Sequence, residues 1–549
     1  MRRPPLFRGT YRDDEAARAV YAEAAGIARA TPLAVAVPAD AEDVVVLVRW
    51  ASESGVTLVP RGSGSGMAGG AVGPGVVVDL SRLAWIGEVD EAARRVRVGP
   101  GALRGAVDAV ARRHGLRFPP DPSSGAYCTL GGMASTNAAG AHTLRYGATR
   151  PWVVALDCVF ADGARAELRR GAPPPRGAPA VERFLDELHP AIVAHERERP
   201  SVHPGVRKES SGYALAEYAR GGDLLDLVVG SEGTLAVIVG LELALAPLPG
   251  ATSSALAAFP SLEQAVAGAA AARELGASAC ELLDRTFLEV VASAAGTAAS
   301  GGAPEVPAGS EAVLLAEVEG ADLDDAAARV AELARAFQRV GAGAVTVALD
   351  DVSEPALWEL RHAASPVLAR LDPALKSMQF VEDGAVPPER LPEYVRGVRE
   401  ALARQEIRGV IFGHAGDAHV HVNPLVDVRR DDWRESVGRL LADVVALTAR
   451  LGGTLAGEHG DGRLRTPQLE HVWPAETRAL FARVKGTFDP GGVLNPGVVV
   501  PLPGQRSLDD VKYDPDLPPP PAAARAVLQR VERERAYASF RLAMLDEAE

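Results

Sequence analysis

The first stretch of this chain that bears on the fold is glycine-rich, P-R-G-S-G-S-G-M-A-G-G-A, at Pro60–Ala71. It follows a short apolar strand predicted over Val56–Val59. Glycines let consecutive backbone N–H groups face an anion, so this pattern is typical of a phosphate cradle. The stretch lacks the Lys-Ser/Thr ending of a nucleoside triphosphatase loop and is not a G-x-G-x-x-G that opens a helix. Taken alone, it is also compatible with a flexible surface loop.

Two more glycine-rich segments follow along the chain. The first is T-L-G-G-M-A-S-T-N-A-A-G at Thr129–Gly140, preceded by P-P-D-P-S-S-G at Pro119–Gly125, and the second is G-S-E-G-T-L-A-V at Gly230–Val237. Hydrophobic patterning predicts strands and helices around them. The strands are Ala34–Pro38, Val76–Leu80 and Arg95–Val98, and the helices are Ala41–Ser54 and Leu103–His114. Three such loops between strands indicate a broad ligand cleft rather than a single phosphate hook.

A histidine-rich segment, G-H-A-G-D-A-H-V-H-V-N-P, stands at Gly413–Pro424. On a strand, His419, His421 and Asn423 share one face because residues two apart point the same way. The small residues before them can turn the chain and bring His414 back over His421. Neutral imidazole is the commonest metal ligand among side chains.

A third ligand is supplied by a second motif, G-E-H-G-D-G at Gly457–Gly462, which offers Glu458 with His459 beside it. A carboxylate is the usual third protein ligand of an open metal site. The sequence therefore predicts a divalent metal site. The alternative is a polar histidine-rich turn without a metal.

Composition limits the class of protein. A length of 549 residues predicts two or three domains, and 47% hydrophobic with 24% charged residues is typical of a globular protein. The net charge of −14 argues against a nucleic-acid surface, so an anionic substrate needs a local positive pocket. The chain has three cysteines, Cys128, Cys158 and Cys280, and no two of them form a C-x-x-C pair. This argues against a cysteine-ligated iron–sulfur cluster and favours a reducing compartment. We find no signal peptide and no 18-residue apolar run, and expect a cytoplasmic protein.

The second half of the chain alternates helices and strands in a different way. Helices are predicted at Leu262–Leu275 and Leu323–Val340, between the strands Ala255–Phe259, Val313–Val318 and Ala344–Leu349. This pattern indicates an α+β plait, with Ala294–Ser310 as a mobile loop. A helix over Asp13–Ala28 precedes the first domain. Beyond Pro501, a Pro-rich linker and a charged helix, Ala522–Leu545, are expected to form an arm.

Seven motifs in a fixed order carry a family resemblance. They are V-P-R-G-S-G-S-G, T-L-G-G-M-A-S-T-N-A-A-G, R-K-E-S-S-G-Y-A-L, G-S-E-G-T-L, G-H-A-G-D-x-x-x-H, G-E-H-G-D-G and V-L-N-P-G. Together they resemble the FAD-linked D-2-hydroxyacid dehydrogenases of the vanillyl-alcohol-oxidase, PCMH-type flavoprotein superfamily. That family includes glycolate oxidase, D-lactate dehydrogenase and D-2-hydroxyglutarate dehydrogenase types. F-V-E-D-G-A-V-P-P-E-R-L at Phe380–Leu391 and the N-terminal extension resemble the flavin half of FAD/iron–sulfur fusion oxidoreductases.

The resemblance implies an α+β fold with a two-lobed PCMH-type FAD-binding domain, an α+β substrate cap and a C-terminal helical segment. We place the extension at 1–29, the FAD domain at 30–247 and the cap at 248–425. A flavin and metal-site segment follows at 426–501, and the linker with its helical tail at 502–549.

The cofactor-binding residues implied by the resemblance lie in the glycine-rich loops, with the pyrophosphate on Arg61–Gly70. They are Arg61, Gly62, Ser63, Gly64, Ser65, Gly66, Pro122, Ser123, Thr129, Gly131, Gly132, Ser135, Asn137, Gly140, Glu232, Gly233, Thr234 and Asn495. Ser65 stands where covalently flavinylated relatives carry a histidine. FAD is therefore expected to be held noncovalently.

The resemblance also assigns the catalytic residues. The residues that match the family's metal ligands are His414, His421 and Glu458, and the metal is expected to be Zn, with Mn or Fe as alternatives. His459 matches the general base; its alternative role is to pack against Glu458 or orient it. The substrate-binding residues implied are Arg361, Ser365, Lys376 and Asn423. An arginine can grip a carboxylate bidentately, although Arg361 and Lys376 could also be solvated surface charges. A segment near the flavin edge in the family is matched by Arg207, Lys208 and Tyr213. These three are weaker candidates for site residues than those named above.

One departure from the family pattern concerns the metal. The family usually reads G-D-G-N-L-H where this chain has G-D-A-H-V-H, so His419 replaces an asparagine and could compete as a ligand.

The leading hypothesis is FAD- and metal-dependent oxidation of a D-2-hydroxy acid, with D-2-hydroxyglutarate or D-lactate favoured. Electrons would pass to a separate acceptor, such as an iron–sulfur protein. The alternatives are a non-catalytic flavin-binding component of an iron–sulfur complex, an oxidase that uses oxygen, and a zinc hydrolase without flavin. We expect no nucleic acid and no transmembrane segment, and we note a homodimer as an option.

Overall fold

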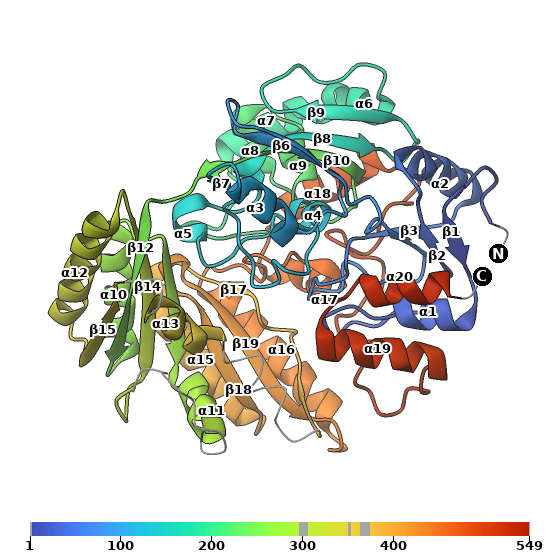
Figure 1. Cartoon of the computed structure of the whole chain (residues 1–549). Helices are drawn as coiled ribbons and strands as arrows, with labels where there is room; N and C mark the ends of the chain where they lie inside the picture. Colours follow the sequence, from blue (N-terminus) through green and yellow to red (C-terminus); the bar gives the residue numbers. More distant parts are fainter. Residues whose placement is uncertain (1–2, 296–305, 350–352, 363–373, 548–549) are drawn as a thin grey trace.

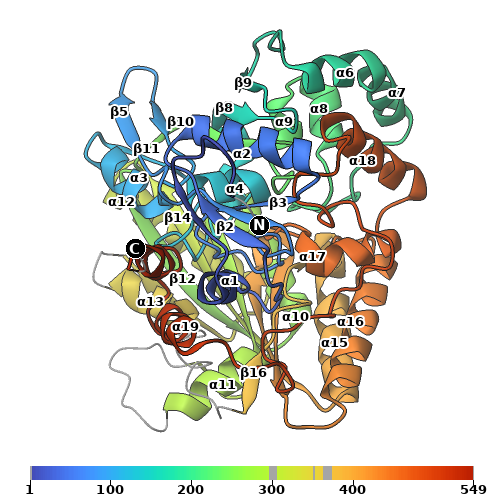
Figure 2. The same cartoon turned by 90° about the vertical axis from the view of Figure 1, so that its right-hand side faces the viewer.

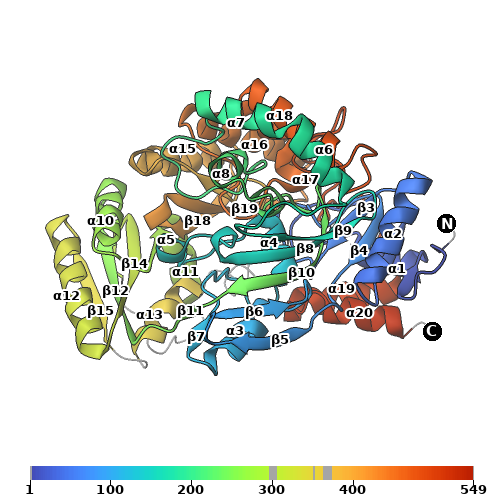
Figure 3. The same cartoon turned by 90° about the horizontal axis from the view of Figure 1, so that it is seen from above.

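The computed structural model describes residues 3–295, 306–349, 353–362 and 374–547. It contains an N-terminal lobe (residues 10–247) built on two sheets and a cap (residues 251–450) built on one large sheet (Figure 1). The C-terminal helices return to the N-terminal lobe, so both termini lie at the same end of the molecule (Figure 3).

The first sheet of the N-terminal lobe has the order β1-β2-β4-β3, in which β2, β4 and β3 are parallel. Its strands are β1 (Thr10–Arg12), β2 (Ala34–Val37), β3 (Leu58–Arg61) and β4 (Val76–Asp79). The crossover helix α2 (Ala41–Ser54) begins at the N-cap Asp40 and ends at Gly55, whose φ is 66°. Strands covered on both faces read as continuous apolar runs, as V-V-V in β4 does. The glycine-rich stretch leaves the sheet at the carboxyl end of β3.

The second sheet of this lobe is antiparallel, with the order β5-β6-β10-β8-β9. Its strands are β5 (Ile86–Asp90), β6 (Arg95–Val98), β8 (Val153–Val159), β9 (Arg165–Arg169) and β10 (Val237–Ala244). Seven α-helices of the described chain contribute buried side chains to the same hydrophobic cluster. They are α3 (Arg104–Arg112), α4 (Leu130–Thr136), α6 (Pro179–Glu187), α7 (His189–Glu198), α8 (Leu215–Gly221), α9 (Leu225–Val228) and α18 (Ala475–Phe488).

The cap sheet is antiparallel and joins two segments far apart in the sequence. Its order is β15-β12-β14-β13-β18-β19-β16, with β17 also paired to β19. The strands are β12 (Ala251–Phe259), β13 (Ala279–Asp284), β14 (Ala312–Gly320), β15 (Ala344–Ala348), β16 (Leu375–Ser377), β17 (Gly384–Ala385), β18 (Arg408–His414) and β19 (His419–Asp427). In Figure 1 the green strands β12 and β14 therefore continue into the orange strands β18 and β19.

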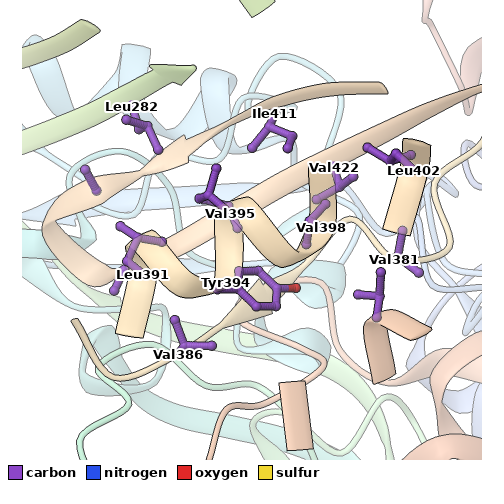
Figure 4. Packing of buried hydrophobic residues seen from close by; sticks show 14 of the residues in the cluster. Leu282, Val381, Val386, Leu391, Tyr394, Val395, Val398, Leu402, Ile411 and Val422 are labelled. Atoms are coloured by element: carbon purple, nitrogen blue, oxygen red, sulfur yellow. The ribbon is translucent and has the colours of Figure 1, made fainter. Parts of the chain in front are cut away.

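The two faces of the cap sheet are covered differently. One face packs against α10 (Leu262–Glu274), α12 (Leu323–Arg339), α15 (Leu391–Arg404) and α16 (Trp433–Arg450). Figure 4 shows Val395 of α15 pointing toward Leu282 and Ile411 of the strands, and Val398 beside Val422. Figure 2 shows α15 beside α16. The other face carries α13 (Ser353–His362) over β12, β14 and β15, and α11 (Arg285–Ala295) over the central strands β13 and β18. The neighbouring part of that face turns toward the N-terminal lobe.

Most of the predicted elements are present with shifted ends. The helix expected over 13–28 is shorter, α1 (Glu15–Tyr21), and its N-cap is Asp14. The boundary placed at residue 425 falls inside β19, and α16 shares the cap core. The loop expected at 294–310 lies largely outside the described residues. No helix of the described chain is long and apolar enough to cross a membrane.

The expectation of a projecting C-terminal arm is wrong. Two helices, α19 (Ala522–Glu534) and α20 (Ser539–Asp546), are separated by Arg535 in the left-handed region (φ 54°). Met544 and Leu545 pack on Val20 of α1 in one apolar cluster. The apolar stripe of this charged segment buries surface that an arm would leave in water, and burial of apolar surface is favourable.

Candidate active site

A tight hairpin between β18 and β19 builds the centre of the site. The 3-10 turn η3 (Ala415–Asp417) ends at Ala418, whose φ of 53° reverses the chain. The resulting register pairs His414 with His419 and Phe412 with His421. Directly opposed residues of an antiparallel pair point to the same side of a sheet. All three imidazoles therefore face the N-terminal lobe, as the alternation in the sequence predicted.

Three donor atoms converge from this hairpin and the G-E-H-G-D-G segment. His414 Nε2 lies 3.4 Å from His421 Nε2. Glu458 Oε1 lies 3.3 Å from His414 Nε2 and 3.2 Å from His421 Nε2. All three side chains are buried. The structure thus brings together the three residues predicted as metal ligands.

The outer nitrogens of both imidazoles are held by fixed acceptors. His414 Nδ1–H donates to the Glu281 carboxylate (2.5 Å), and His421 Nδ1–H donates to the backbone carbonyl of Glu382 (3.0 Å). Such partners fix the tautomer that leaves Nε2 as the electron-pair donor. Two imidazole nitrogens and one carboxylate oxygen are a donor set that suits a divalent ion such as zinc, with one position left open. The residues present therefore fit a metal.

His419 offers a fourth nitrogen to this group. One ring nitrogen of His419 lies within 4.8 Å of the donor atoms of His414, His421 and Glu458. Its Nε2–H donates to Asp383 (2.8 Å), and its buried Nδ1 has no hydrogen-bond partner among the described residues. Burial lowers the pKa of His419 to about 3, so the ring is neutral. The departure from the family motif therefore adds a potential ligand.

The G-E-H-G-D-G segment is held in place by Asp383 and by a buried lysine. Asp383 accepts the backbone N–H groups of Glu458 (3.2 Å) and His459 (2.8 Å). Lys208 Nζ lies 2.5 Å from Glu458 Oε2 and donates to the carbonyl of Gly140 (3.3 Å). Burial alone raises the pKa of Glu458, but the charges of Lys208 and His414 outweigh it and hold that pKa well below its usual range.

His459 lies at the edge of the cluster, with its side chain 27% exposed. Its Nδ1 lies 3.2 Å from Glu382 Oε1, and its ring is stacked 5.4 Å from that of His421. Arg465 forms an ion pair with Glu382 behind it. Burial lowers the pKa of His459, but the negative charges of Asp383, Glu382 and Glu458 outweigh it and raise the pKa to about 9. A proton-exchanging side chain is thus positioned beside the converging donors.

The predicted substrate-binding residues lie in different places relative to the histidine cluster. Arg361 of α13 donates through Nε to Glu281 (2.7 Å) and stacks over Phe412 at 4.6 Å, next to the cluster. Asn423 lies on the same face of β19 as His421. Lys376 pairs with Val426, on the opposite face of the sheet, and its Nζ lies 5.7 Å from the ring centre of Tyr513. Ser365 lies outside the described residues.

The first glycine-rich loop presents a row of free donors. From Ser63 to Ala68, the backbone N–H groups have no acceptor among the residues that the structure describes. Gly66 is exposed, and a Cβ placed on it would meet nothing within 4 Å. Consecutive free N–H groups in a glycine-rich loop bind anions, so this loop fits a pyrophosphate. Arg61 does not join them: it is buried, donates to the carbonyls of Ala71 and Glu23, and stacks on Tyr21.

The other two loops and the N-P-G segment meet the first loop. Gly62 lies so close to Thr129 that a Cβ would come within 2.1 Å of its Oγ1. Asn495 Nδ2 donates to the carbonyls of Gly70 (3.0 Å) and Glu232 (2.7 Å). The Glu232 N–H donates to the carbonyl of Ser135 (2.7 Å). All three predicted cofactor loops therefore form one contiguous wall.

Several predicted cofactor residues stabilise this wall through their side chains. Glu232 accepts the backbone N–H groups of Asp461 (2.7 Å) and Gly462 (3.1 Å). Asn137 accepts the N–H of Arg150, and Thr129 caps α4. The remaining predicted residues of the second and third loops lie in the same segments: Pro122, Ser123, Gly131, Gly132, Gly140, Gly233 and Thr234.

Two family models match the chain. Residues 248–499 match the family model "FAD linked oxidases, C-terminal domain", and residues 32–169 match an FAD binding domain. The chain belongs to the FAD-linked oxidases. The resemblance drawn from its motifs is confirmed, and the protein is an FAD-dependent oxidoreductase.

Relatives of this FAD-linked oxidase cover nearly its whole length. It is 30% identical to the glycolate oxidase subunit GlcD of Bacillus subtilis, over 88% of this chain and 93% of the relative. It is 31% identical to a D-lactate dehydrogenase of Archaeoglobus fulgidus, over 84% and 90%. It is 30% identical to a D-2-hydroxyglutarate dehydrogenase of Pseudomonas putida, over 92% of this chain but 52% of that protein.

The fold has solved counterparts. A substrate-bound p-cresol methylhydroxylase superposes with a TM-score of 0.67 at 13% identity, over 90% of this chain and 94% of that one. At that identity the likeness concerns the fold alone. The expected α+β, two-lobed PCMH-type fold is confirmed.

Residue patterns did not reveal the supporting carboxylates of this FAD-linked oxidase. Glu281, Glu382 and Asp383 each hold a histidine of the site. A signal was present, because acidic residues within the apolar stretches A-C-E-L-L-D and F-V-E-D-G-A-V are rarely buried unless paired. Lys208, which the resemblance places near the flavin edge, is the buried cation on Glu458.

Proposed function

We propose that this enzyme oxidises a D-2-hydroxy acid to the 2-oxo acid with FAD and a divalent metal, passing electrons to a separate acceptor. The observation that carries the proposal is the convergence of His414 Nε2, His421 Nε2 and Glu458 Oε1 within 3.4 Å of one another, beside the proton-exchanging His459. A hydroxyl group bound at such a site is both polarised and within reach of a base.

The glycine-rich wall supplies the flavin site. When bound, FAD takes up the C2 hydrogen and two electrons from the substrate. The free N–H groups of Ser63–Ala68 would hold its pyrophosphate, and Thr129, Ser135, Glu232 and Asn495 shape the loops around it. Ser65 has no nucleophilic imidazole, so the flavin is noncovalent in this proposal.

The hairpin supplies the metal site and the base. A divalent ion bound there would lower the pKa of the substrate hydroxyl and neutralise developing negative charge. His414, His421 and Glu458 would hold the ion, with His419 as a further donor. His459 receives the hydroxyl proton when its imidazole is neutral, and Asp383 and Glu382 keep that ring in place.

The substrate carboxylate would be bound by Arg361, with Asn423 on the same face of β19. Arg361 has fork geometry suited to a carboxylate and is already oriented by Glu281 and Phe412. Lys376 is left out of the proposed site because its strand register turns it away. The relatives named for glycolate, D-lactate and D-2-hydroxyglutarate support a 2-hydroxy acid, and we favour D-lactate or D-2-hydroxyglutarate.

Anaerobic mixing with 2-hydroxy acids tests the proposal without a known acceptor. Purified protein is combined with D- and L-lactate, D- and L-2-hydroxyglutarate and glycolate, while flavin absorbance is followed by stopped flow. Bleaching is expected with at least one D-acid and not with its L-enantiomer. A yellow protein that no substrate bleaches would support the alternative of a non-catalytic flavin-binding component.

Two further measurements test the cofactors. Acid precipitation should release all FAD into the supernatant, and a yellow pellet would overturn the noncovalent assignment. Metal analysis of the purified protein should find about one divalent ion per chain. Metal-free protein that reduces its flavin at full rate would overturn the metal requirement.

A further inference from the structure

One buried carboxylate links the metal ligands to the substrate clamp. Glu281 is fully buried on β13. Its Oε1 accepts from His414 Nδ1 (2.5 Å), and its Oε2 accepts from Arg361 Nε (2.7 Å). Each oxygen is therefore committed to a different functional residue.

The fold imposes this bridge. β13 pairs with β18 so that Glu281 lies directly opposite His414, which places both side chains on one face. On the same face, α13 lies over the outer strands of the sheet and brings Arg361 to the second oxygen. The guanidinium is also fixed by Phe412, which pairs with His421 in the next strand. A single side chain thus contacts residues of both proposed binding functions.

We propose that Glu281 is a positioning residue that sets the tautomer of His414 and the orientation of Arg361 together. This inference rests on the proposed function. By accepting the Nδ1 proton, Glu281 leaves the Nε2 electron pair of His414 directed at Glu458 and His421. By accepting from Nε of Arg361, it leaves the terminal nitrogens of that guanidinium to grip a carboxylate.

The isosteric change Glu281→Gln separates the two roles. A glutamine has one oxygen and one NH₂ group, so it can accept from only one of the two partners. Arg361 cannot give up its protons, whereas the imidazole of His414 can move its proton from Nδ1 to Nε2. The amide oxygen is therefore expected to stay with Arg361, and its NH₂ group to face His414 Nδ1. The proton then occupies the nitrogen that should bind the metal.

The expected result is selective loss of metal affinity. In E281Q the Zn²⁺ dissociation constant, measured by competition with a chromophoric chelator, should rise by about 10–100-fold, the usual effect of losing a partner that orients a ligand. FAD content should stay at one per chain, because the flavin loops lie elsewhere. Unchanged Zn²⁺ affinity in E281Q, with wild-type protein binding Zn²⁺, would overturn the inference.

A second substitution should reverse the effect. In the double variant Arg361→Ala/Glu281→Gln, no guanidinium donates to the amide oxygen of residue 281. That oxygen can then accept from His414 Nδ1 again. Zn²⁺ affinity should return to within a few-fold of that of Arg361→Ala alone. A double variant that binds Zn²⁺ as weakly as E281Q would contradict the tautomer argument, because a merely structural defect is not repaired by removing a second side chain.

A matched control comes from the same strand. Asp284 of β13 is equally buried and binds Arg399 Nε at 2.8 Å, with no histidine in contact among the described residues. Asp284→Asn should lower the melting temperature while leaving Zn²⁺ affinity unchanged. Equal loss of Zn²⁺ in Asp284→Asn and E281Q would reduce the role of Glu281 to packing. Wild-type protein without Zn²⁺ affinity would instead refute the proposed function.

Discussion

Two histidine–carboxylate clusters in this molecule, one buried and one half-buried, are built from the same groups but arranged in opposite ways. In the hairpin cluster, His414 and His421 each give one nitrogen to a fixed acceptor and turn the other toward a common point. In the second, His142 bridges the N-terminal lobe and the cap. Its Nδ1 lies 2.5 Å from Asp121, and its Nε2 lies 2.9 Å from Glu317 of β14.

The arrangement decides the charge of each ring. Burial lowers the pKa of His142, but the charges of Asp121 and Glu317 outweigh it and raise that pKa well above 6.5. Burial lowers the pKa of His421, and its outer nitrogen meets a neutral carbonyl rather than a carboxylate. Burial lowers the pKa of His414 too, but the charges of Glu281 and Glu458 outweigh it and raise the pKa to about 9, so a metal must displace a proton from this ring. A ring such as His142, held between two carboxylates, is a charged bridge. A neutral ring with one nitrogen free can bind a metal.

The largest effect should come from removing a converging donor. Glu458→Ala and His414→Ala should each lose the metal and slow flavin reduction by roughly 10⁴-fold or more, because several kcal/mol of charge stabilisation are lost and each 1.4 kcal/mol is tenfold. Metal content and stopped-flow reduction measure both. His142→Gln serves as the control and should retain its metal. Full metal occupancy in both variants would contradict the proposal that the hairpin cluster, unlike the His142 cluster, binds the metal.

The next effect concerns the proton rather than the metal. His459→Ala should slow flavin reduction by about 10²–10⁴-fold, the usual contribution of a general base. Metal content and substrate affinity should change little. Reduction at a near wild-type rate would assign the base to another group.

A smaller effect is expected at Arg361, the proposed carboxylate-binding residue. Arg361→Ala should raise KM by about 10–100-fold, since hydrogen bonds to charged groups contribute about 1.5–3 kcal/mol. The fall in kcat should be smaller, because the carboxylate is bound in both ground and transition states. Steady-state kinetics with an artificial acceptor distinguish the two parameters, and an unchanged KM would remove Arg361 from the clamp.

The smallest effect is on stability at the second cluster. His142→Gln should lower the free energy of unfolding by about 1–3 kcal/mol at pH 6, through loss of charge-assisted hydrogen bonds. Because the folded-state pKa of His142 is raised, this stabilisation is complete below about 6.5 and is lost as the pH rises through the folded pKa. Denaturant melts of wild type and variant should therefore converge with increasing pH. A gap independent of pH would mean that His142 is not a charged bridge.

The sequence by itself determined the glycine-rich loops, the common face of the hairpin histidines and most of the helices and strands. These features are local. The alternation H-V-H-V-N fixes which side chains share a face of β19, and glycines at 62–70 fix a loop that can present its N–H groups. Helix ends such as Asp40 and Gly55 also follow from adjacent residues. The order of the motifs along the chain was then sufficient to identify the family.

The tertiary structure alone decided which distant groups meet these motifs. Glu281 reaches His414 because β13 pairs with β18, across 133 positions of the sequence. Lys376 turns away because its strand register is set by pairing with β19, and a shift by one residue would reverse its face. The C-terminal helices pack on α1 because their apolar side chains are buried there against those of α1. Such pairings depend on long-range burial, which no local pattern encodes.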